Sequence, residues 1–279
     1  MQSFVFAAVL FAAACHAGWN ALIKVGLDPL SSTILIAVGA AVVSLVGLPA
    51  VGLPASAAWP WLIASAFIHL FYFAALAEGY RTGDLGQVYP IARGSAPLMT
   101  ATASAFLLGE HLSVFAWTGI VALAAGVLLL SARGGVVHLE RRAVGYALLT
   151  GLTICAYSLT DGIGARRSQN PQAYVAWLFV ATAVVLLPYG LWRNRTGMTI
   201  ALRCFWPRGL IGGALQAFSY GIALWAMTLA PIAIVAALRE TSVLFGALIA
   251  VLVLKEPLRA ARMVAAALIV GGLVLIRLQ

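Results

Sequence analysis

Charged residues are scarce in this sequence. Asp, Glu, Lys and Arg make up only 9% of its 279 residues, whereas 63% are hydrophobic and the mean hydropathy is +1.02. Soluble domains carry about 25% charged residues, and a soluble helical protein needs a polar face on each helix. The sequence has too few polar residues for such faces, so its composition predicts an integral membrane protein.

Several patterns that carry chemistry are also missing. Cys15, Cys155 and Cys204 are far apart and lack CxxC or Cys/His spacing, so we expect no disulfide and no metal site. No GxxxxGK[ST] motif is present, which argues against ATP hydrolysis, and neither HExxH nor GxSxG occurs. We therefore expect no cofactor and no enzymatic activity. An intramembrane enzyme that acts on lipid phosphates stays an alternative.

The net charge of +9 does not indicate nucleic acid binding. Lys and Arg occur singly or in pairs at the ends of apolar segments, and they form no continuous basic stripe. Most of them fall in alternate loops, near residues 24, 81, 133–142, 193–208 and 255–262, whereas Arg166 and Arg167 oppose this bias. The positive-inside rule then places these loops in the cytoplasm and both termini in the periplasm.

Apolar runs of about 20 residues, the length that crosses a hydrocarbon core of about 30 Å, repeat along the whole chain. Turn signals such as Asp28-Pro29, Asn170-Pro171 and Ala230-Pro231 separate them. The pattern predicts an all-α integral membrane fold with ten transmembrane helices and no extramembrane domain. The predicted helices cover residues 3–23, 32–51, 59–80, 86–108, 113–131, 143–164, 172–192, 208–229, 231–254 and 258–277.

The two halves of the sequence resemble each other. A shift of 146 residues aligns LLGEHLS with VLKEPLR and PIARGSAPL with AALRETSVL, so Glu110 corresponds to Glu256 and Arg93 to Arg239. Five helices per half is an odd number, so the second half enters the membrane from the opposite face. Such inverted repeats are typical of secondary transporters, with the substrate site between the halves. An old duplication kept only for packing is the alternative.

The repeats divide the chain into three parts. We expect a first five-helix repeat at 1–134, a linker at 135–142 and a second five-helix repeat at 143–279.

These features resemble the EamA family of the drug/metabolite transporter superfamily. The resemblance is carried by GWNALIKVG in the first helix, GEHLS after the fourth helix and KEPLR after the ninth. Within the family, the chain is similar to bacterial inner-membrane exporters of aromatic amino acids. The resemblance implies a secondary exporter of amino acids or related metabolites that works by alternating access at a central cavity between the repeats. Its partners would be a small-molecule substrate and the lipid bilayer, while the oligomeric state stays open, with a monomer as one option. Exporters of other metabolites or drugs are the alternative.

Arg93 and Arg239 are permanent cations at equal depth in corresponding helices. A charge at the centre of a spanning helix costs about 2.5–3.5 kcal/mol. The arginines either snorkel or form internal ion pairs, or they line the cavity and bind an anionic group such as a carboxylate. Glu240 could hold a cation, but neighbours on a helix point about 100° apart, so Arg239 and Glu240 are not expected to face one spot.

Further polar and aromatic side chains lie within the predicted helices. Aromatic rings with a polar tip suit a pocket for flat, partly apolar substrates, although they also suit the membrane interface. The predicted substrate-binding residues are Arg93, Arg239, Tyr89, Tyr72, His69, Tyr220, Gln216, Trp19, Asn20 and Tyr157.

A second group of residues suits proton transfer or gating. His16 and Asn20 share a helix face, as do Tyr157 and Asp161, and buried His or Asp can titrate near neutral pH, with helix–helix hydrogen bonds as the alternative. Prolines inside a helix permit bending. The predicted proton or gating residues are His16, Glu78, Asp161, Glu240, Pro90 and Pro97, with Glu78 and Asp161 near helix ends.

Overall fold

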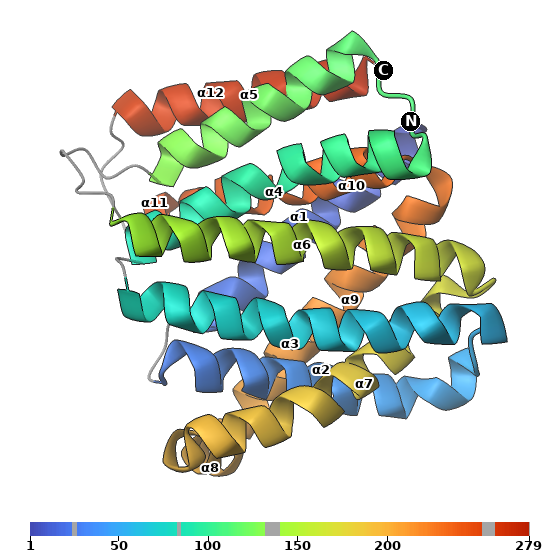
Figure 1. The fold of residues 1–279 in the computed structure, drawn as a ribbon, viewed down its shortest axis with the longest axis vertical. Coiled ribbons are helices and arrows are strands. Elements are labelled where there is room, and N and C mark those ends of the chain that lie inside the picture. The colour runs from blue at the N-terminus through green and yellow to red at the C-terminus, as the bar shows by residue number, and fades with distance from the viewer. Residues whose placement is uncertain (24–26, 83–84, 132–139, 253–259, 279) are drawn as a thin grey trace. The chain divides into compact units, whose positions relative to one another are not determined.

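The structure is a computed structural model that describes residues 1–23, 27–82, 85–131, 140–252 and 260–278. All regular elements in these residues are helices (Figure 1). They are α1 (Ser3–Ile23), α2 (Pro29–Val51), the 3-10 helix η1 (Ser56–Ala58), α3 (Trp59–Thr82), α4 (Leu85–Leu108), α5 (Val114–Ser131), α6 (Arg141–Arg167), α7 (Pro171–Arg193), α8 (Arg195–Cys204), α9 (Trp206–Leu229), α10 (Ile232–Arg239), α11 (Ser242–Leu252) and α12 (Ala260–Arg277).

The predicted all-α membrane fold is confirmed. Eight stretches of helix in the described residues are long and apolar enough to span a membrane. The count of ten transmembrane helices and the inversion of the second repeat stay predictions. Two features of the helices were not expected: α8 is a short helix inside the loop at 193–208, and the predicted helix at 231–254 is interrupted between α10 and α11.

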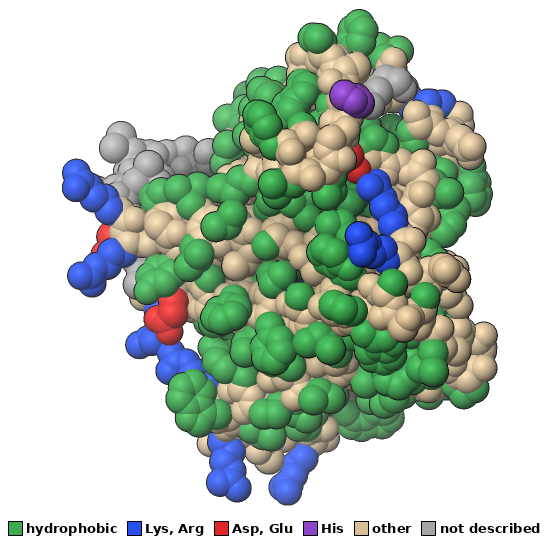
Figure 2. Space-filling model, turned by 45° about the vertical axis from the view of Figure 1, so that its right-hand side comes forward, with side chains coloured by type: hydrophobic (Ala, Val, Ile, Leu, Met, Phe, Trp, Pro, Cys, Tyr) green, Lys and Arg blue, Asp and Glu red, His purple; other side chains and the backbone are tan. Residues whose placement is uncertain are grey.

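The outer surface of the protein is strongly apolar. Large hydrophobic side chains such as Val46, Phe106 and Val114 are more than three-quarters exposed. Figure 2 shows hydrophobic side chains over most of the visible face. Apolar surface on this scale is costly in water but is satisfied by lipid tails, in agreement with a multi-pass membrane protein.

Two compact units make up the chain. Unit 1 contains Met1–Leu10, Phe71–Leu159 and Ala230–Gln279, and unit 2 contains Phe11–Leu70 and Thr160–Leu229. Each unit therefore takes helices from both halves of the sequence. The repeat boundaries at 1–134, 135–142 and 143–279 describe the sequence duplication and stay predictions.

Unit 1 contains closely packed helices. Helix α5 packs along α12, and α4 packs against α5 and α10 (Figure 1). A Cβ atom on Gly119 of α5 would lie only 2.7 Å from the carbonyl oxygen of Gly272 of α12, so the missing side chain allows the two backbones to approach. Arg277 donates to the carbonyl oxygen of Met1 at 2.9 Å, so the N-terminal end of α1 lies beside the C-terminal end of α12.

Unit 2 is held by equally close contacts. Helix α2 packs against α7 and α9, and a Cβ atom on Gly39 of α2 would lie 1.9 Å from the carbonyl oxygen of Gly209 of α9. Within this unit, Arg166 donates from Nε to the carbonyl oxygen of Met227 at 2.8 Å, and the guanidinium of Arg167 lies 5.4 Å from the centre of the Trp61 ring. The two cations that oppose the loop charge bias therefore have structural partners.

Candidate functional site

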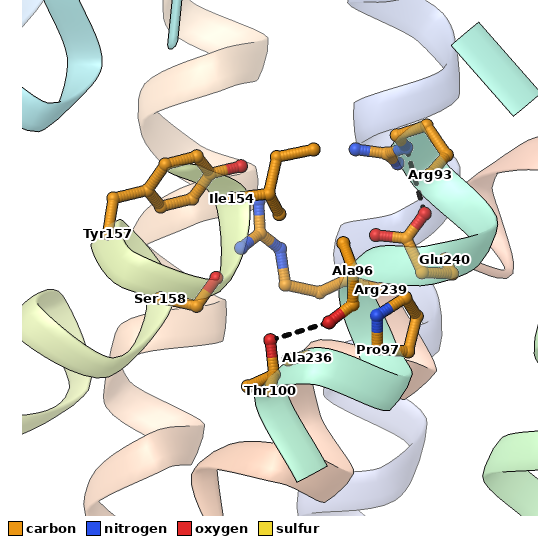
Figure 3. A pocket seen from close by; sticks show the side chains of 10 residues that line it. All are labelled: Arg93, Ala96, Pro97, Thr100, Ile154, Tyr157, Ser158, Ala236, Arg239 and Glu240. Atoms are coloured by element: carbon orange, nitrogen blue, oxygen red, sulfur yellow. Dashed lines mark hydrogen bonds and ion pairs between the residues drawn. The ribbon is translucent and has the colours of Figure 1, made fainter. Parts of the chain in front are cut away.

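Unit 1 contains a small polar pocket, which we call the arginine pocket (Figure 3). Helices α4, α6 and α10 and the turn after α10 form its walls. Its volume is about 10 Å³, which is roughly the space that one water molecule needs. The lining residues are Arg93, Ala96, Pro97, Thr100, Ile154, Tyr157, Ser158, Ala236, Arg239 and Glu240.

Arg93 forms an internal ion pair in this pocket. Its Nε atom lies 2.8 Å from Oε2 of Glu240, and its Nη2 donates to Oγ of Ser242 at 3.0 Å. The side chains of Arg93 and Glu240 are only 6% and 5% exposed. The internal ion pair that the sequence left open as one interpretation is therefore present, while binding of an anionic substrate group by Arg93 stays a prediction.

Arg239 lines the same pocket from the end of α10. It is 8% exposed, and Figure 3 shows its guanidinium extending toward Ile154 and Tyr157 of α6. Arg239 and Glu240 both line the pocket, but Figure 3 shows their side chains extending in different directions, with the carboxylate of Glu240 toward Arg93. The α-helix ends at Arg239, and the amides of Glu240 and Thr241 donate to Ala237 O at 3.0 Å and to Leu238 O at 3.1 Å, a tighter 3-10 pattern in which neighbouring side chains point about 120° apart.

The helix that carries Arg93 in the first half of the sequence corresponds to the one that carries Arg239 in the second half. The two predicted gating prolines lie in the first of these helices, which is not interrupted. Pro90 and Pro97 are inside α4, which continues from Leu85 to Leu108. The break falls in the second copy, which has no internal proline, so the two copies differ in backbone as well as in sequence. The gating role of the prolines stays a prediction.

Several predicted residues lie at or near the arginine pocket. Tyr157 lines it, and the ring of Tyr72 meets the ring of Tyr157 edge to face at 5.8 Å between centroids. Tyr89 is on α4, but its side chain lies outside the described residues. The pocket residue Ser158 and the Arg93 partner Ser242 were missed, because lone serines in apolar helices carry no sequence signal.

A second buried polar group occurs in unit 2, where Asp161 of α6 is completely buried. Its Oδ1 accepts a hydrogen bond from the hydroxyl of Tyr174 at 3.0 Å, and its Oδ2 accepts one from the hydroxyl of Tyr220. The His69 ring contacts the Tyr220 ring at 6.5 Å. The sequence placed Asp161 near a helix end, which needs correction. Helix α6 continues for six more residues to Arg167, and the carboxylate is buried inside the protein.

Other predicted residues of unit 2 lie on α1 and α9. His16 packs edge to face on Trp19 at 4.9 Å, and Asn20 donates to the carbonyl oxygen of His16 at 2.8 Å. The Nε1 atom of Trp19 and the Oε1 atom of Gln216 are buried without a hydrogen-bond partner in the part of the chain that the structure describes. Their proposed contact with substrate stays a prediction.

Glu78 of unit 1 has an ordinary surface contact. Its carboxylate pairs with Arg81 at 3.0 Å near the end of α3, where both side chains are at least one-third exposed. This is the helix-end position expected from the sequence.

The acidic residue of the GEHL motif has a structural role in unit 1. Glu110 accepts hydrogen bonds from the backbone amides of Ile232 at 2.9 Å and Ala233 at 3.3 Å, at the start of α10. A carboxylate at a helix N-terminus satisfies amides that lack intrahelical partners and interacts favourably with the helix dipole. Gly109 precedes it with φ of 65°, a conformation that glycine adopts readily. The counterpart Glu256 lies outside the described residues.

Comparisons with known proteins agree with this architecture. The model of the EamA-like transporter family matches residues 3–132 and 141–278, one match in each half of the sequence. No curated protein matches the chain. A crystal structure of a protein has the same fold, with a TM-score of 0.79, 20% sequence identity, and coverage of 100% of this chain and 99% of that one. The family match covers nearly the whole sequence, and the chain therefore belongs to the EamA-like transporter family, whose members are membrane transporters.

Proposed function

We propose that this membrane transporter is a secondary exporter of amino acids or related small metabolites in a bacterial inner membrane, with aromatic amino acids as the first candidates. The observation that carries the proposal is the charge pattern of the arginine pocket. Two guanidinium groups, from Arg93 and Arg239, and one carboxylate, from Glu240, line a single buried space.

This set of charges is complementary to an amino acid. The planar guanidinium fork of Arg239 suits a carboxylate, which it can bind through two parallel hydrogen bonds. Glu240 suits the ammonium group once its ion pair with Arg93 loosens. The hydroxyls of Thr100 and Ser158 add polar contacts on the same wall.

The aromatic preference rests on two tyrosines. Tyr157 lines the pocket and Tyr72 contacts it edge to face. Aromatic rings attract each other in edge-to-face and offset arrangements, with a gain of about 0.5–1.5 kcal/mol beyond their buried area. A substrate ring against Tyr157 would extend this pair.

Transport requires the pocket to open. A volume of about 10 Å³ holds a water molecule but no amino acid, so substrate enters only after the walls move apart. The break between α10 and α11 supplies a backbone position that can change angle without unwinding a helix. We infer that alternating access, with the two repeats rocking, opens the cavity to each side in turn, and that both termini face the periplasm.

A proteoliposome counterflow screen tests the proposal. We expect aromatic amino acids to exchange, while the corresponding amines without a carboxylate do not. Arg239→Lys should need at least ten times more amino acid for half-maximal exchange, because a lysine keeps the charge but cannot form two parallel hydrogen bonds. Arg142→Lys, on the exposed start of α6, should exchange normally. Equal transport of amino acids and amines would refute carboxylate recognition.

Two alternatives have their own outcomes in the screen. Exchange of purely anionic metabolites would favour another substrate class of the superfamily, because the pocket has one more cation than anions. Product formation from a lipid substrate in detergent would favour an intramembrane enzyme.

A further inference from the structure

The most unusual buried group outside the arginine pocket is the Asp161 cluster of unit 2, which consists of Asp161, Tyr174 and Tyr220 with Ser65 and His69 beside them. Asp161 has 0% exposure, and each of its two oxygens accepts a hydrogen bond from a tyrosine hydroxyl. In the described residues, no Lys or Arg is within ion-pair distance of it. A buried carboxylate without a permanent cation beside it is costly to keep and calls for a functional explanation.

The partners of Asp161 allow a change of protonation without a change of structure. A tyrosine hydroxyl can donate to a carboxylate or accept from a carboxylic acid, so the same heavy-atom positions serve both states. Glu240 of unit 1 is the opposite case, because its partner Arg93 is a permanent cation that can only donate. Among the described residues, Glu240 is thus a buried acid whose charge is held by a cation, whereas the hydrogen-bond partners of Asp161 suit both its protonation states.

We propose that Asp161 is a proton-binding site and that transport is coupled to proton movement through it. A proton from the water on one side of the membrane converts the carboxylate to the acid, and the acid later returns that proton to the other side. This inference rests on the proposed function, because a coupled proton needs a transported substrate.

The neighbours of Asp161 fit a proton better than a metal ion. From α3, Ser65 and His69 are close enough to act on its charge, and α7 and α9 contribute Tyr174 and Tyr220. Arg166 of α6 is engaged with the carbonyl oxygen of Met227. A metal ion would need several oxygen lone pairs pointing at one point, but both carboxylate oxygens already accept hydrogen bonds. His69 is a titratable neighbour through which a proton could pass.

The position of Asp161 on α6 connects it with the substrate wall. Tyr157 and Ser158, which line the arginine pocket, precede Asp161 by four and three residues on the same continuous helix. Four residues correspond to about 6 Å along the axis and to one turn, so Tyr157 and Asp161 share a helix face. A shift of α6 when Asp161 changes charge would move Tyr157 as well.

The test uses the full-length protein in proteoliposomes with an imposed pH gradient, once the screen has identified a substrate. The wild type should accumulate substrate against its concentration gradient, and a trapped pH indicator should report proton movement when substrate is added. Asp161→Asn should lose both responses. Counterflow of substrate should continue in this variant, because the exchange of one substrate molecule for another needs no proton at position 161. Glu140→Gln is the matched control, since Glu140 is an exposed acid at the start of the same helix.

Three results of the transport measurements would overturn the inference. Uphill accumulation by Asp161→Asn at the wild-type level is the first, and accumulation by the wild type in a sodium gradient but not a pH gradient is the second. If Asp161→Asn does not yield folded protein, Tyr220→Phe and Tyr174→Phe replace it, because the loss of one hydroxyl should shift the pH at which counterflow is half-maximal. An unchanged pH profile in both tyrosine variants is the third.

An infrared measurement separates this inference from the proposed function. Difference spectra between acid and alkaline buffers need no substrate, and the wild type should have a carboxylic acid band that Asp161→Asn lacks and Glu140→Gln keeps. The band without any transported amino acid would refute the proposed substrate and support the proton site. Amino acid counterflow without the band would refute the proton site alone.

Discussion

The ion pair between Arg93 and Glu240 allows a quantitative test of what holds the arginine pocket together. At 2.8 Å and an effective dielectric constant of about 20, two unit charges attract by about 6 kcal/mol. Removing both charges from water costs several kcal/mol per ion, so the net contribution of the pair is small. Removing one partner is different, because the remaining charge is buried and unpaired, at a cost of about 3–5 kcal/mol.

These magnitudes predict a strongly non-additive double-mutant cycle. Arg93→Met and Glu240→Gln should each destabilise the protein by about 3–5 kcal/mol, whereas the double variant should approach the wild type, with a coupling free energy of about 3 kcal/mol or more. The assay is equilibrium unfolding of the purified protein in detergent, with counterflow measured in parallel. Stability should return in the double variant, but transport should not, because the substrate then meets only one of its charged partners.

The result that refutes this reasoning is additivity. If the two single effects sum in the double variant, Arg93 and Glu240 do not depend on each other, and the buried pair is not what stabilises the pocket. Recovery of both stability and transport would refute the substrate role of these residues and leave them purely structural.

Three further predictions follow from other contacts. Glu110→Ala should destabilise the protein by about 1–2 kcal/mol in thermal unfolding, because two amides of α10 lose their acceptor, and an unchanged midpoint would mean that the cap contributes nothing. Gly39→Leu should abolish folded protein on size-exclusion chromatography, because its Cβ would lie 1.9 Å from Gly209 O, whereas Gly145→Ala, with nothing within 4 Å, should remain monodisperse. Arg239→Lys should raise the KM for a carboxylate substrate at least tenfold in initial-rate uptake with little change in stability, and an unchanged KM would exclude bidentate binding.

The comparison of Arg93 with Arg239 illustrates how far sequence reasoning reaches. Their alignment predicted two buried cations at matching positions, and the structure places both in the lining of one pocket. It did not predict that Arg93 is held by Glu240, because the two residues are far apart in the sequence and only the packing of α4 against α10 brings them together. The break of the second copy after Arg239 was not predicted either. No proline or glycine marks that break, so local turn signals could not reveal it.

Asp161 illustrates the same limit in unit 2. Its sequence position indicated an ionisable residue on an apolar helix, and its spacing from Tyr157 indicated a shared face. Tyr174 was not among the predicted residues, because it follows the start of α7 and looks like an interface aromatic. Only the packing of α6 against α7, where a Cβ on Gly164 would meet the Tyr174 ring at 2.5 Å, brings that hydroxyl to the carboxylate.

By itself, the sequence determined the membrane location, the all-helical fold, the duplicated halves and the family, because hydropathy, turn residues and repeats act along the chain and need no knowledge of distant contacts. The tertiary structure decided which buried charges are paired, where the second copy of the arginine helix breaks and what surrounds Asp161. In a bilayer the apolar surfaces of helices are nearly equivalent, so helix partners are selected by close glycine contacts and by a few polar groups. Those partners are set in space, between residues that lie far apart in the sequence.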